Sequence, residues 1–351
     1  MTMLPDPATE PLASPLVVWC DARFHADIRA RLVEGARPHQ VVFAHDAPPP
    51  NAPGFDNSRI TREEPIPAAE LSEADCAFGQ PDPQAVLSAG KRLRWVHITS
   101  AGYTRYDKPA FWDGCRAGNV AFTNSSQVYD EPCAQHALAM LLAFARQLPQ
   151  SLDAQRTDRA WNGSERRNAS FLLNEQTVLM LGYGAIGRRL AALLAPFDMT
   201  LMAVRRKPTG KETADGLSEV VSEADLSRVL SLADHIVNLL PESDATRGYV
   251  SAERFTQMKS GTFFYNIGRG ATVQQTALLA ALESGHLGGA YLDVTDPEPL
   301  PADHPLWTAP NCFISPHSAG GHKGEQERLV DHFLRNLHAF ARGEALMDQV
   351  V

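Results

Sequence analysis

Three ionisable residues in the second half of the chain, Arg269, Glu298 and His317, each follow a segment that is typical of a β-strand. Doubly wound sheets bind ligands beyond the carboxyl ends of their strands, so we expect these side chains at one sheet edge. Together they suit the reduction of a 2-oxo acid. The guanidinium binds the carboxylate and polarises the carbonyl, the imidazole donates the proton, and the carboxylate raises the imidazole pKa. Singly, each also has an ordinary interpretation, as a surface ion pair, a turn residue or a solvated histidine.

A nicotinamide cofactor supplies the hydride in such a reaction, and a glycine motif predicts where one binds. The apolar segment 178–181 runs into Gly182-x-Gly184-x-x-Gly187, and apolar residues then recur at helical spacing up to Phe197. In a strand–turn–helix, these glycines allow a tight turn, a close approach of the pyrophosphate and close helix packing. The helix N-terminus favours the anion. The alternative is a glycine-rich turn that binds no ligand.

The residues at the end of the next predicted strand, 200–204, bear on the choice of cofactor. That strand is followed by Arg205, Arg206 and Lys207. An NAD-specific fold places an acidic residue there to accept hydrogen bonds from the ribose hydroxyls, whereas an arginine matches a 2′-phosphate in shape and charge. The sequence therefore predicts a preference for NADP(H), with NAD(H) use as the main competitor. A solvated basic loop is the ordinary alternative.

The composition excludes several other classes of protein. The 351 residues are 44% hydrophobic and 21% charged, with a formal net charge of −9 and no basic tract, so we expect neither a nucleic-acid nor a membrane partner. No secretory signal is recognisable, and no apolar run approaches the ~20 residues that span a bilayer. The five cysteines are odd in number and lack metal-type spacing, which indicates reduced thiols and no metal site. We expect a soluble cytoplasmic protein. The cysteines are Cys20, Cys76, Cys115, Cys133 and Cys312.

The first part of the chain gives weaker signals. Residues 1–15 carry four prolines and predict a mobile leader, and the proline-rich stretch with Pro48, Pro49, Pro50 and Pro53 predicts a loop. We expect a long helix over 131–147, with Asp130 as its N-cap and Pro132 in its first turn. The strands expected in this part are 16–20, 75–78 and 93–99.

From residue 177 onward, strand and helix patterns alternate, which predicts a doubly wound parallel sheet. The length suggests two domains. We expect an NAD(P)-binding Rossmann domain over 125–320, inserted into a flavodoxin-like substrate domain formed by 16–124 and 321–351. The expected strands are 177–181, 200–204, 235–239, 262–266, 288–292 and 312–315. The expected helices are 187–197, 226–232, 251–258, 274–284 and a final helix over 325–342.

Several of these segments resemble the D-isomer-specific 2-hydroxyacid dehydrogenase family, and within it the glyoxylate/hydroxypyruvate reductase branch. The resemblance runs from about residue 75 to the C-terminal helix and is most specific over 177–320. The matching segments read Leu-Gly-Tyr-Gly-Ala-Ile-Gly (181–187), Leu-Leu-Pro-Glu-Ser-Asp-Ala-Thr-Arg-Gly (239–248), Asn-Ile-Gly-Arg-Gly (266–270), Gly-Ala-Tyr-Leu-Asp-Val-x-x-x-Glu-Pro-Leu (289–300) and Ser-Pro-His (315–317).

The resemblance implies roles for individual residues. Arg269, Glu298 and His317 would be the catalytic set, and Asp293 would hold the nicotinamide carboxamide. Backbone N–H groups of Ser100, Ala101 and Gly102 would bind the substrate carboxylate together with Arg269. The family also implies a homodimer packed largely through the nucleotide domains. The implied cofactor-binding residues are Gly182, Gly184, Ala185, Ile186, Gly187, Arg205, Arg206, Leu240, Pro241, Thr246, Ile267, Asp293 and Gly320.

The chain departs from the family pattern in two places. The usual Ala-Glu-His-Ala of the long helix is Ala-Gln-His-Ala here, so Gln135 replaces a charge beside His136. The loop 103–107 reads Tyr-Thr-Arg-Tyr-Asp, and its Tyr103, Arg105 and Tyr106 either admit a larger or more polar substrate or simply pack the loop. His322 and Trp307 are further candidates near the mouth of the site, with structural roles as their alternative.

These observations favour an NADP(H)-preferring reductase that converts a 2-oxo acid of the glyoxylate or hydroxypyruvate kind into the D-2-hydroxy acid. Two alternatives stay open. One is an NAD-linked dehydrogenase of the phosphoglycerate type, against which Arg205 argues. The other is a nicotinamide-sensing, corepressor-like binding protein with little turnover, against which the complete set of Arg269, Glu298 and His317 argues.

Overall fold

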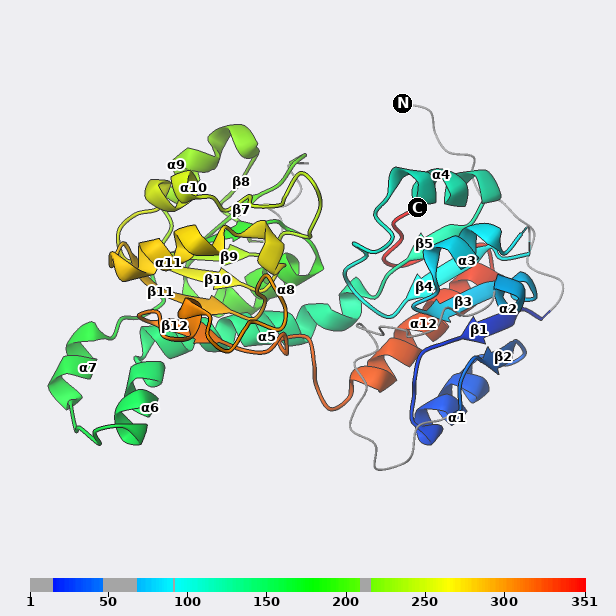
Figure 1. Cartoon of the computed structure of the whole chain (residues 1–351), viewed down its shortest axis with the longest axis horizontal. Coiled ribbons are helices and arrows are strands. Elements are labelled where there is room, and N and C mark those ends of the chain that lie inside the picture. The colour runs from blue at the N-terminus through cyan, green and yellow to red at the C-terminus, as the bar shows by residue number, and fades with distance from the viewer. Residues whose placement is uncertain (1–14, 47–67, 91, 209–215) are drawn as a thin grey trace. The chain divides into compact units, whose positions relative to one another are not determined.

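The computed structural model describes residues 15–46, 68–90, 92–208 and 216–351 (Figure 1). These residues form two compact units. Unit 1 contains the described residues up to Val128 together with His322–Val351, and unit 2 contains Tyr129–Gly321. The expected leader, apart from Pro15, and the expected proline-rich loop lie outside the described residues.

Unit 1 is built on a parallel five-stranded sheet whose order, β2-β1-β3-β4-β5, is the flavodoxin-like one. The expected strands β1, β3 and β4 are confirmed, whereas β2 and β5 at the two edges were not predicted. The strands are β1 (Val17–Cys20), β2 (Gln40–Phe43), β3 (Cys76–Gly79), β4 (Trp95–Ile98) and β5 (Ala121–Thr123). The helices are α1 (Ala26–Gly35), α2 (Ala68–Ser72), α3 (Pro83–Ser88), α4 (Pro109–Gly118) and α12 (Glu325–Ala341).

Alternation along β4 shows how both faces of this sheet are covered. Val96 and Ile98 belong to a buried cluster with residues of α3 and α4. Because side chains alternate along a strand, Trp95 faces the opposite side, where its ring stacks on Phe333 of α12 at 5.2 Å. Phe333 also stacks on Phe78 of β3 at 4.1 Å. The C-terminal helix therefore completes the core of unit 1.

Unit 2 is built on a parallel seven-stranded sheet of order β12-β11-β10-β9-β6-β7-β8, which is the Rossmann order with one added strand. All six strands expected after residue 177 are confirmed within two residues, and the short β8 was not predicted. The strands are β6 (Thr177–Leu181), β7 (Thr200–Val204), β8 (Glu219–Val221), β9 (His235–Asn238), β10 (Thr262–Asn266), β11 (Leu287–Leu292) and β12 (Cys312–Ile314).

Helices cover both faces of this sheet (Figure 1). On one face, α9, α10 and α11 share a buried cluster with the strands. On the other, Phe144 of the long helix α5 contacts Phe263, Tyr265 and Phe313. The helices are α5 (Ser126–Ala145), α6 (Leu148–Arg156), α7 (Gly163–Ala169), α8 (Ala185–Leu194), α9 (Leu226–Leu230), α10 (Ala252–Gln257) and α11 (Gln275–Glu283). Short 3₁₀ turns lie at Ala195–Phe197, Glu223–Asp225, Gly270–Thr272 and Pro305–Trp307.

The expected start of the long helix is wrong. Helix α5 begins at Ser126, so Asp130 is not its N-cap and Pro132 lies inside the helix. At the observed start, the side-chain Oδ1 of Asn124 accepts a hydrogen bond from the N–H of Ser126, the first residue of the helix, at 3.1 Å. The expected boundary was placed too late because proline is common in the first turn of a helix and rare inside one, whereas Pro132 lies inside α5.

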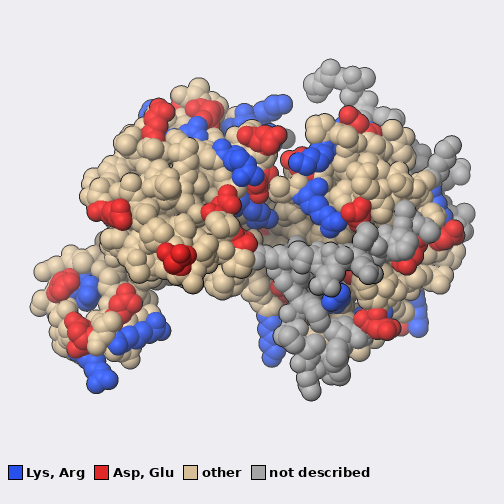
Figure 2. All heavy atoms as spheres, in the orientation of Figure 1, with Lys and Arg blue, Asp and Glu red and all other residues tan. Residues whose placement is uncertain are grey.

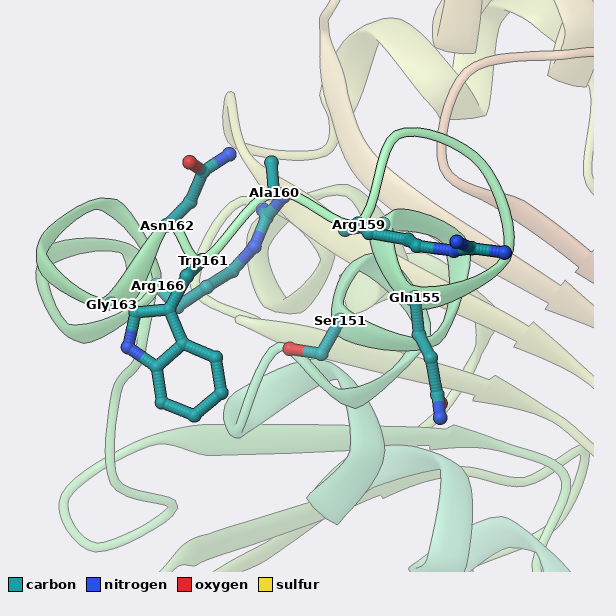
Figure 3. Close-up of a pocket in the computed structure, with 9 residues that line it drawn as sticks. Ser151, Gln155, Arg159, Ala160, Trp161, Asn162, Gly163 and Arg166 are labelled. Atoms are coloured by element: carbon teal, nitrogen blue, oxygen red, sulfur yellow. The ribbon is translucent and has the colours of Figure 1, made fainter.

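Helices α6 and α7 extend from the rest of unit 2 (Figure 1). Neither was predicted. The loops beside them carry unusually exposed apolar residues: Trp161, between the two helices, is 97% exposed, and Leu172, after α7, is 65% exposed. Trp161 lines an open hollow of about 740 Å³ between the two helices, together with Arg159 and Arg166 (Figure 3).

The distribution of charge and the apolar content of the helices bear on possible partners. On the face drawn in Figure 2, basic and acidic side chains are interspersed on both units. In the part of the chain that the structure describes, no helix combines the length and the apolar content needed to cross a membrane.

Candidate active site

The glycine turn after β6 has the local geometry that its sequence predicts. Gly182 has a φ of +97°, which a side chain rarely adopts, and its N–H bonds to the Val204 carbonyl at 3.1 Å. A Cβ on Gly187 would lie 3.1 Å from the Tyr183 ring, so this glycine lets α8 pack close to the turn. A Cβ on Gly184, by contrast, would meet no atom within 4 Å.

The open space beside Gly184 lies at the N-terminus of α8. Gly184 is the N-cap residue, and no side chain caps the helix. The N–H groups of the first helical turn, which include those of Ala185 and Ile186, have no partner inside the helix. An uncapped helix N-terminus with space for an anion fits the pyrophosphate of a dinucleotide. This fit supports the cofactor-binding role of the glycine motif.

The basic residues after β7 follow Val204, whose carbonyl accepts the hydrogen bond from the Gly182 N–H. The backbone N–H of Arg205 bonds to the Val221 carbonyl of β8 at 2.9 Å, so the sheet fixes the place where this loop leaves β7. Arg205 is half-buried, and Arg206 and Lys207 are exposed. Residues 209–215 lie outside the described residues. The binding of a 2′-phosphate by these arginines stays a prediction.

A buried polar network supports the loop that carries Arg269. The side chain of Asn238 donates to Asn266 at 2.9 Å and to Thr272 at 2.7 Å. The side chains of Asn266 and Thr272 both donate to the Arg269 carbonyl, at 3.2 and 2.6 Å. The Asn238 carbonyl accepts from the Ile267 N–H at 3.1 Å. Sequence reasoning missed these three residues, although Asn238 and Asn266 stand in predicted strands and Thr272 lies in the loop that carries Arg269.

Two glycines beside Arg269 bring this loop against its neighbours. A Cβ on Gly268 would lie 2.7 Å from the Leu240 carbonyl oxygen, and a Cβ on Gly270 would lie 2.0 Å from the Thr295 backbone. Leu240 begins a turn in which the Thr246 hydroxyl donates to the Pro241 carbonyl at 2.6 Å. Glycine is therefore required at both positions for steric reasons.

His317 and Glu298 form a direct pair. The distance between His317 Nδ1 and Glu298 Oε2 is 2.9 Å, and the two side chains are 28% and 29% exposed. The other Glu298 oxygen accepts from the Thr295 N–H at 3.1 Å, so Gly270, Thr295 and Glu298 form a continuous set of contacts. Because Nδ1 donates to the carboxylate, Nε2 is the ring nitrogen that can exchange a proton with a ligand.

The turn that carries His317 is held by Asp293. This residue is 3% exposed, and its carboxylate accepts from the Ser315 hydroxyl at 2.5 Å and from the Ser318 and Ala319 N–H groups at 2.8 and 3.1 Å. His317 has a φ of +51°, a left-handed conformation that costs free energy in a non-glycine residue. The carboxylate hydrogen bonds hold the turn in that conformation. Holding the nicotinamide carboxamide, as expected for Asp293, stays a prediction.

Gly320 follows the His317 turn and packs closely against α5. A Cβ at this position would lie 3.0 Å from the Tyr129 ring, and the sulfur of Cys133 would be the next neighbour at 3.7 Å. Steric need is therefore sufficient to explain the glycine. Its expected role in cofactor binding stays a prediction.

In unit 1, side chains hold the loop formed by Ser100, Ala101 and Gly102. The Ser100 hydroxyl donates to the Gly102 carbonyl at 2.7 Å and accepts from the Gln80 amide at 3.0 Å. Asn124, whose side chain also bonds to the first residue of α5, donates to the Ala101 carbonyl at 2.8 Å. Sequence reasoning missed Gln80 and Asn124. Gln80 lies just after a predicted strand, which could have pointed to it, whereas Asn124 follows β5, which was not predicted. Substrate binding by the loop stays a prediction.

The structure shows the contacts of the loop 103–107, whose side chains were expected either to contact the substrate or to pack the loop. Tyr106 is 1% exposed and its hydroxyl donates to the Pro81 carbonyl at 2.7 Å, so this residue packs the loop. Arg105 pairs with Asp82 at 3.0 Å. Tyr103 contacts Trp112 edge to face, with ring centroids 5.8 Å apart.

Three other candidates also have contacts in the structure. The Gln135 amide donates to Glu131, one helical turn earlier, which pairs with Arg189 of α8. His322 Nδ1 accepts from the Gly324 N–H at 3.1 Å, and the Trp307 indole donates to the Pro301 carbonyl at 2.9 Å. Glu131 thus supplies a carboxylate near the position where the family pattern has one.

Comparisons with known proteins identify the family of this chain. The model of the D-isomer specific 2-hydroxyacid dehydrogenase NAD-binding domain matches residues 138–319. The human glyoxylate reductase/hydroxypyruvate reductase is 30% identical over 297 residues, which cover 82% of this chain and 88% of the relative. Glyoxylate/hydroxypyruvate reductase B of Citrobacter koseri is 31% identical over 243 residues, covering 66% of this chain and 70% of the relative.

A solved structure supports the fold. A D-isomer specific 2-hydroxyacid dehydrogenase from Xanthobacter autotrophicus Py2, in complex with NADPH and MES, has a TM-score of 0.74 and 24% identity. The match covers 97% of this chain and 98% of that one. The chain belongs to the D-isomer-specific 2-hydroxyacid dehydrogenase family. Its sequence is similar to the glyoxylate/hydroxypyruvate reductase branch of these NAD(P)-dependent oxidoreductases.

The open space at Gly184 gives a test of the cofactor site. We expect Gly184→Val to weaken NADPH binding at least about tenfold, because its side chain fills space that a phosphate needs, while the melting temperature changes by less than ~2 °C. Isothermal titration and thermal unfolding measure these quantities. Gly163→Val is the control, since its Cβ, at the start of α7, would meet only the exposed Trp161 side chain, at 4.0 Å. Unchanged NADPH affinity in Gly184→Val would place the cofactor elsewhere.

Proposed function

We propose that the protein is an NADP(H)-preferring reductase that converts a 2-oxo acid into the D-2-hydroxy acid. The observation that carries this proposal is the pair of His317 and Glu298, 2.9 Å apart, in the same unit as the glycine turn. A protein that only binds a nicotinamide cofactor needs the glycine turn but no proton donor. An enzyme that reduces a carbonyl group also needs a proton donor, and a carboxylate that orients it, for turnover.

The residues act as follows in this proposal. Arg269 binds the substrate carboxylate, and its positive charge polarises the adjacent carbonyl. His317 donates the proton from Nε2 to the carbonyl oxygen, and Glu298 stabilises the protonated ring and fixes its orientation. NADPH, when bound, supplies the hydride to the carbonyl carbon. One hydride and one proton thus convert the 2-oxo group into a hydroxyl group, and His317 is reprotonated from water.

The proposed cofactor preference rests on Arg205 and Arg206. The segment after β7 reads Arg-Arg-Lys and offers no carboxylate to the ribose hydroxyls. A guanidinium instead forms charge-assisted hydrogen bonds to a 2′-phosphate. NADPH use in turn favours the reductive direction. We also propose the cytoplasm as the location, since all five cysteines are free and four of them are buried.

The proposed substrates are small 2-oxo acids such as glyoxylate and hydroxypyruvate, which are named for the relatives from human and Citrobacter koseri. Tyr106 is buried in the packing of its loop, and Arg105 forms an ion pair with Asp82. Because these contacts already engage both side chains, they support a small substrate over one with an additional polar group. Stopped absorbance assays with NADPH against glyoxylate, hydroxypyruvate, pyruvate and branched or aromatic 2-oxo acids test this. We expect the highest kcat/KM for glyoxylate and hydroxypyruvate. No turnover with any of them, despite tight NADPH binding, would favour the sensing protein.

A second copy of this chain is the proposed partner of α6 and α7. The exposed apolar residues of these helices and of the loop between them, which include the 48% exposed Leu152 and Trp161, suit burial against another copy. We expect a homodimer in sedimentation equilibrium, and a monomer for the double variant Leu152→Lys with Trp161→Ser. Leu232→Lys is the matched control, because Leu232 is also 48% exposed and lies after α9. A monomeric unmodified protein would contradict the proposal.

The Arg205 assignment gives a separate prediction. In Arg205→Asp we expect kcat/KM for NADPH to fall by about 10- to 100-fold, the range of a lost charge-assisted hydrogen bond plus repulsion. The kcat/KM for NADH should change by less than about threefold, because NADH has no 2′-phosphate. Steady-state kinetics with both cofactors measures the ratio. Equal losses for the two cofactors would refute the assignment.

A further inference from the structure

A line of hydrogen bonds runs from helix α5 to the turn that carries His317. The Tyr291 hydroxyl lies 2.5 Å from His136 Nε2 and 2.5 Å from the Ser315 hydroxyl oxygen. The Ser315 hydroxyl donates in turn to Asp293 Oδ1 at 2.5 Å. The four residues come from α5, from β11 and the residue after it, and from the residue after β12, so the line crosses three elements of unit 2.

The number of protons fixes the direction of this line. Ser315 has one hydroxyl proton, and it is used on the Asp293 carboxylate, which can only accept. The short contact between the Tyr291 and Ser315 oxygens therefore needs the tyrosine proton. The contact between Tyr291 and His136 then needs a proton on His136 Nε2. All three contacts are satisfied only when each residue donates to the next, from His136 to Asp293.

Because residues of this line are buried, the loss of any of its hydrogen bonds would be costly. Tyr291 is 2% exposed and Asp293 is 3% exposed. Burial raises the pKa of Tyr291, so its hydroxyl keeps the proton that the line requires. The His136 ring also stacks on Tyr291, with centroids 5.3 Å apart, which holds donor and acceptor in register. A buried polar line of this kind is costly when any member loses its partner.

The line ends on the group that holds His317. The same Asp293 oxygen that accepts from Ser315 also accepts from the Ser318 N–H at 2.8 Å. These bonds hold the left-handed backbone of His317, whose own N–H bonds to the Asp293 carbonyl at 2.8 Å. Without the line, Ser315 can turn away and the strained backbone can relax. The imidazole would then leave its position against Glu298.

We propose that Tyr291 is a positioning residue for His317, acting with His136 through Ser315 and Asp293. The role rests on the proposed function of His317 as the proton donor. It assigns to helix α5 a direct part in the geometry of the turn after β12. Tyr291 itself contacts neither the substrate nor the reacting atoms in this proposal.

The sheet supplies a matched control for Tyr291. Tyr265 lies directly opposite Tyr291 on the neighbouring strand β10, is also buried, and its hydroxyl also bonds to a histidine, His235 Nδ1, at 3.0 Å. Tyr265→Phe therefore removes a buried tyrosine–histidine hydrogen bond from the same sheet. Only Tyr291→Phe also breaks a line that reaches the His317 turn.

Hydrogen exchange of the ligand-free protein is the first arm of the test. In Tyr291→Phe, we expect the backbone amides of 315–321 to exchange about tenfold faster than in the unmodified protein, whereas Tyr265→Phe leaves their exchange unchanged. Mass spectrometry of peptides that cover this segment measures the rates. Unchanged exchange in Tyr291→Phe, or an equal increase in Tyr265→Phe, overturns the proposal. Because this arm uses no substrate, it decides the matter even when the proposed function fails.

Kinetics form the second arm. We expect kcat of Tyr291→Phe to fall about tenfold, with the KM values for NADPH and the 2-oxo acid within twofold, because the proton donor is displaced while binding is retained. Ser315→Ala should reproduce this loss, Ser315→Thr should restore the hydroxyl and most of kcat, and the double variant with Tyr291→Phe should be no worse than either single change. Additive losses, or no rescue by threonine, overturn the proposal. Should Tyr291→Phe not fold, the serine variants carry the same test in both arms.

Discussion

The buried carboxylate of Asp293 is the constraint on which the geometry of the site depends. A buried carboxylate is costly unless hydrogen bonds compensate its charge, and here the compensation comes from the segment 315–319. Those same bonds require a tight turn, and the tight turn requires the left-handed backbone of His317. The hydrogen bonds that compensate the buried charge of Asp293 therefore also position His317, the proposed proton donor. Tyr291 and His136 extend the same requirement to α5.

The same physical arrangement recurs at other strand ends. Asn238 and Asn266, buried at the carboxyl ends of β9 and β10, hold the carbonyl of Arg269 directly or through Thr272. In unit 1, Gln80 after β3 holds the Ser100 loop. Parallel strands leave unpaired backbone groups at this edge, and buried amides are short, rigid partners for them. Rigid loops follow, and the residues proposed for chemistry stand on those loops.

The features that the sequence predicted are those set by local chemistry. The Gly182–Gly187 motif and the buried strands β6 and β10 could be predicted because a positive φ, a close approach and a continuous apolar run each leave a local pattern. Strand β2 was missed because it is short, lies at a sheet edge and has no buried residue, and the start of α5 was misplaced because Pro132 is typical of a first helical turn. The line through Tyr291 could not be predicted, because its members, residues 136, 291, 315 and 293, meet only in the folded unit. Nor did any pattern mark α6 and α7.

The central claim is that a proton from His317 and a hydride from the cofactor reduce the 2-oxo group together. The most direct measurement is to supply NADPH deuterated at both C4 positions with hydroxypyruvate and to analyse the product by NMR. The account predicts D-glycerate that carries deuterium on C2, and at least about 100-fold slower formation by His317→Gln with unchanged NADPH affinity. Glycerate without deuterium on C2, or undiminished formation by His317→Gln, would contradict it.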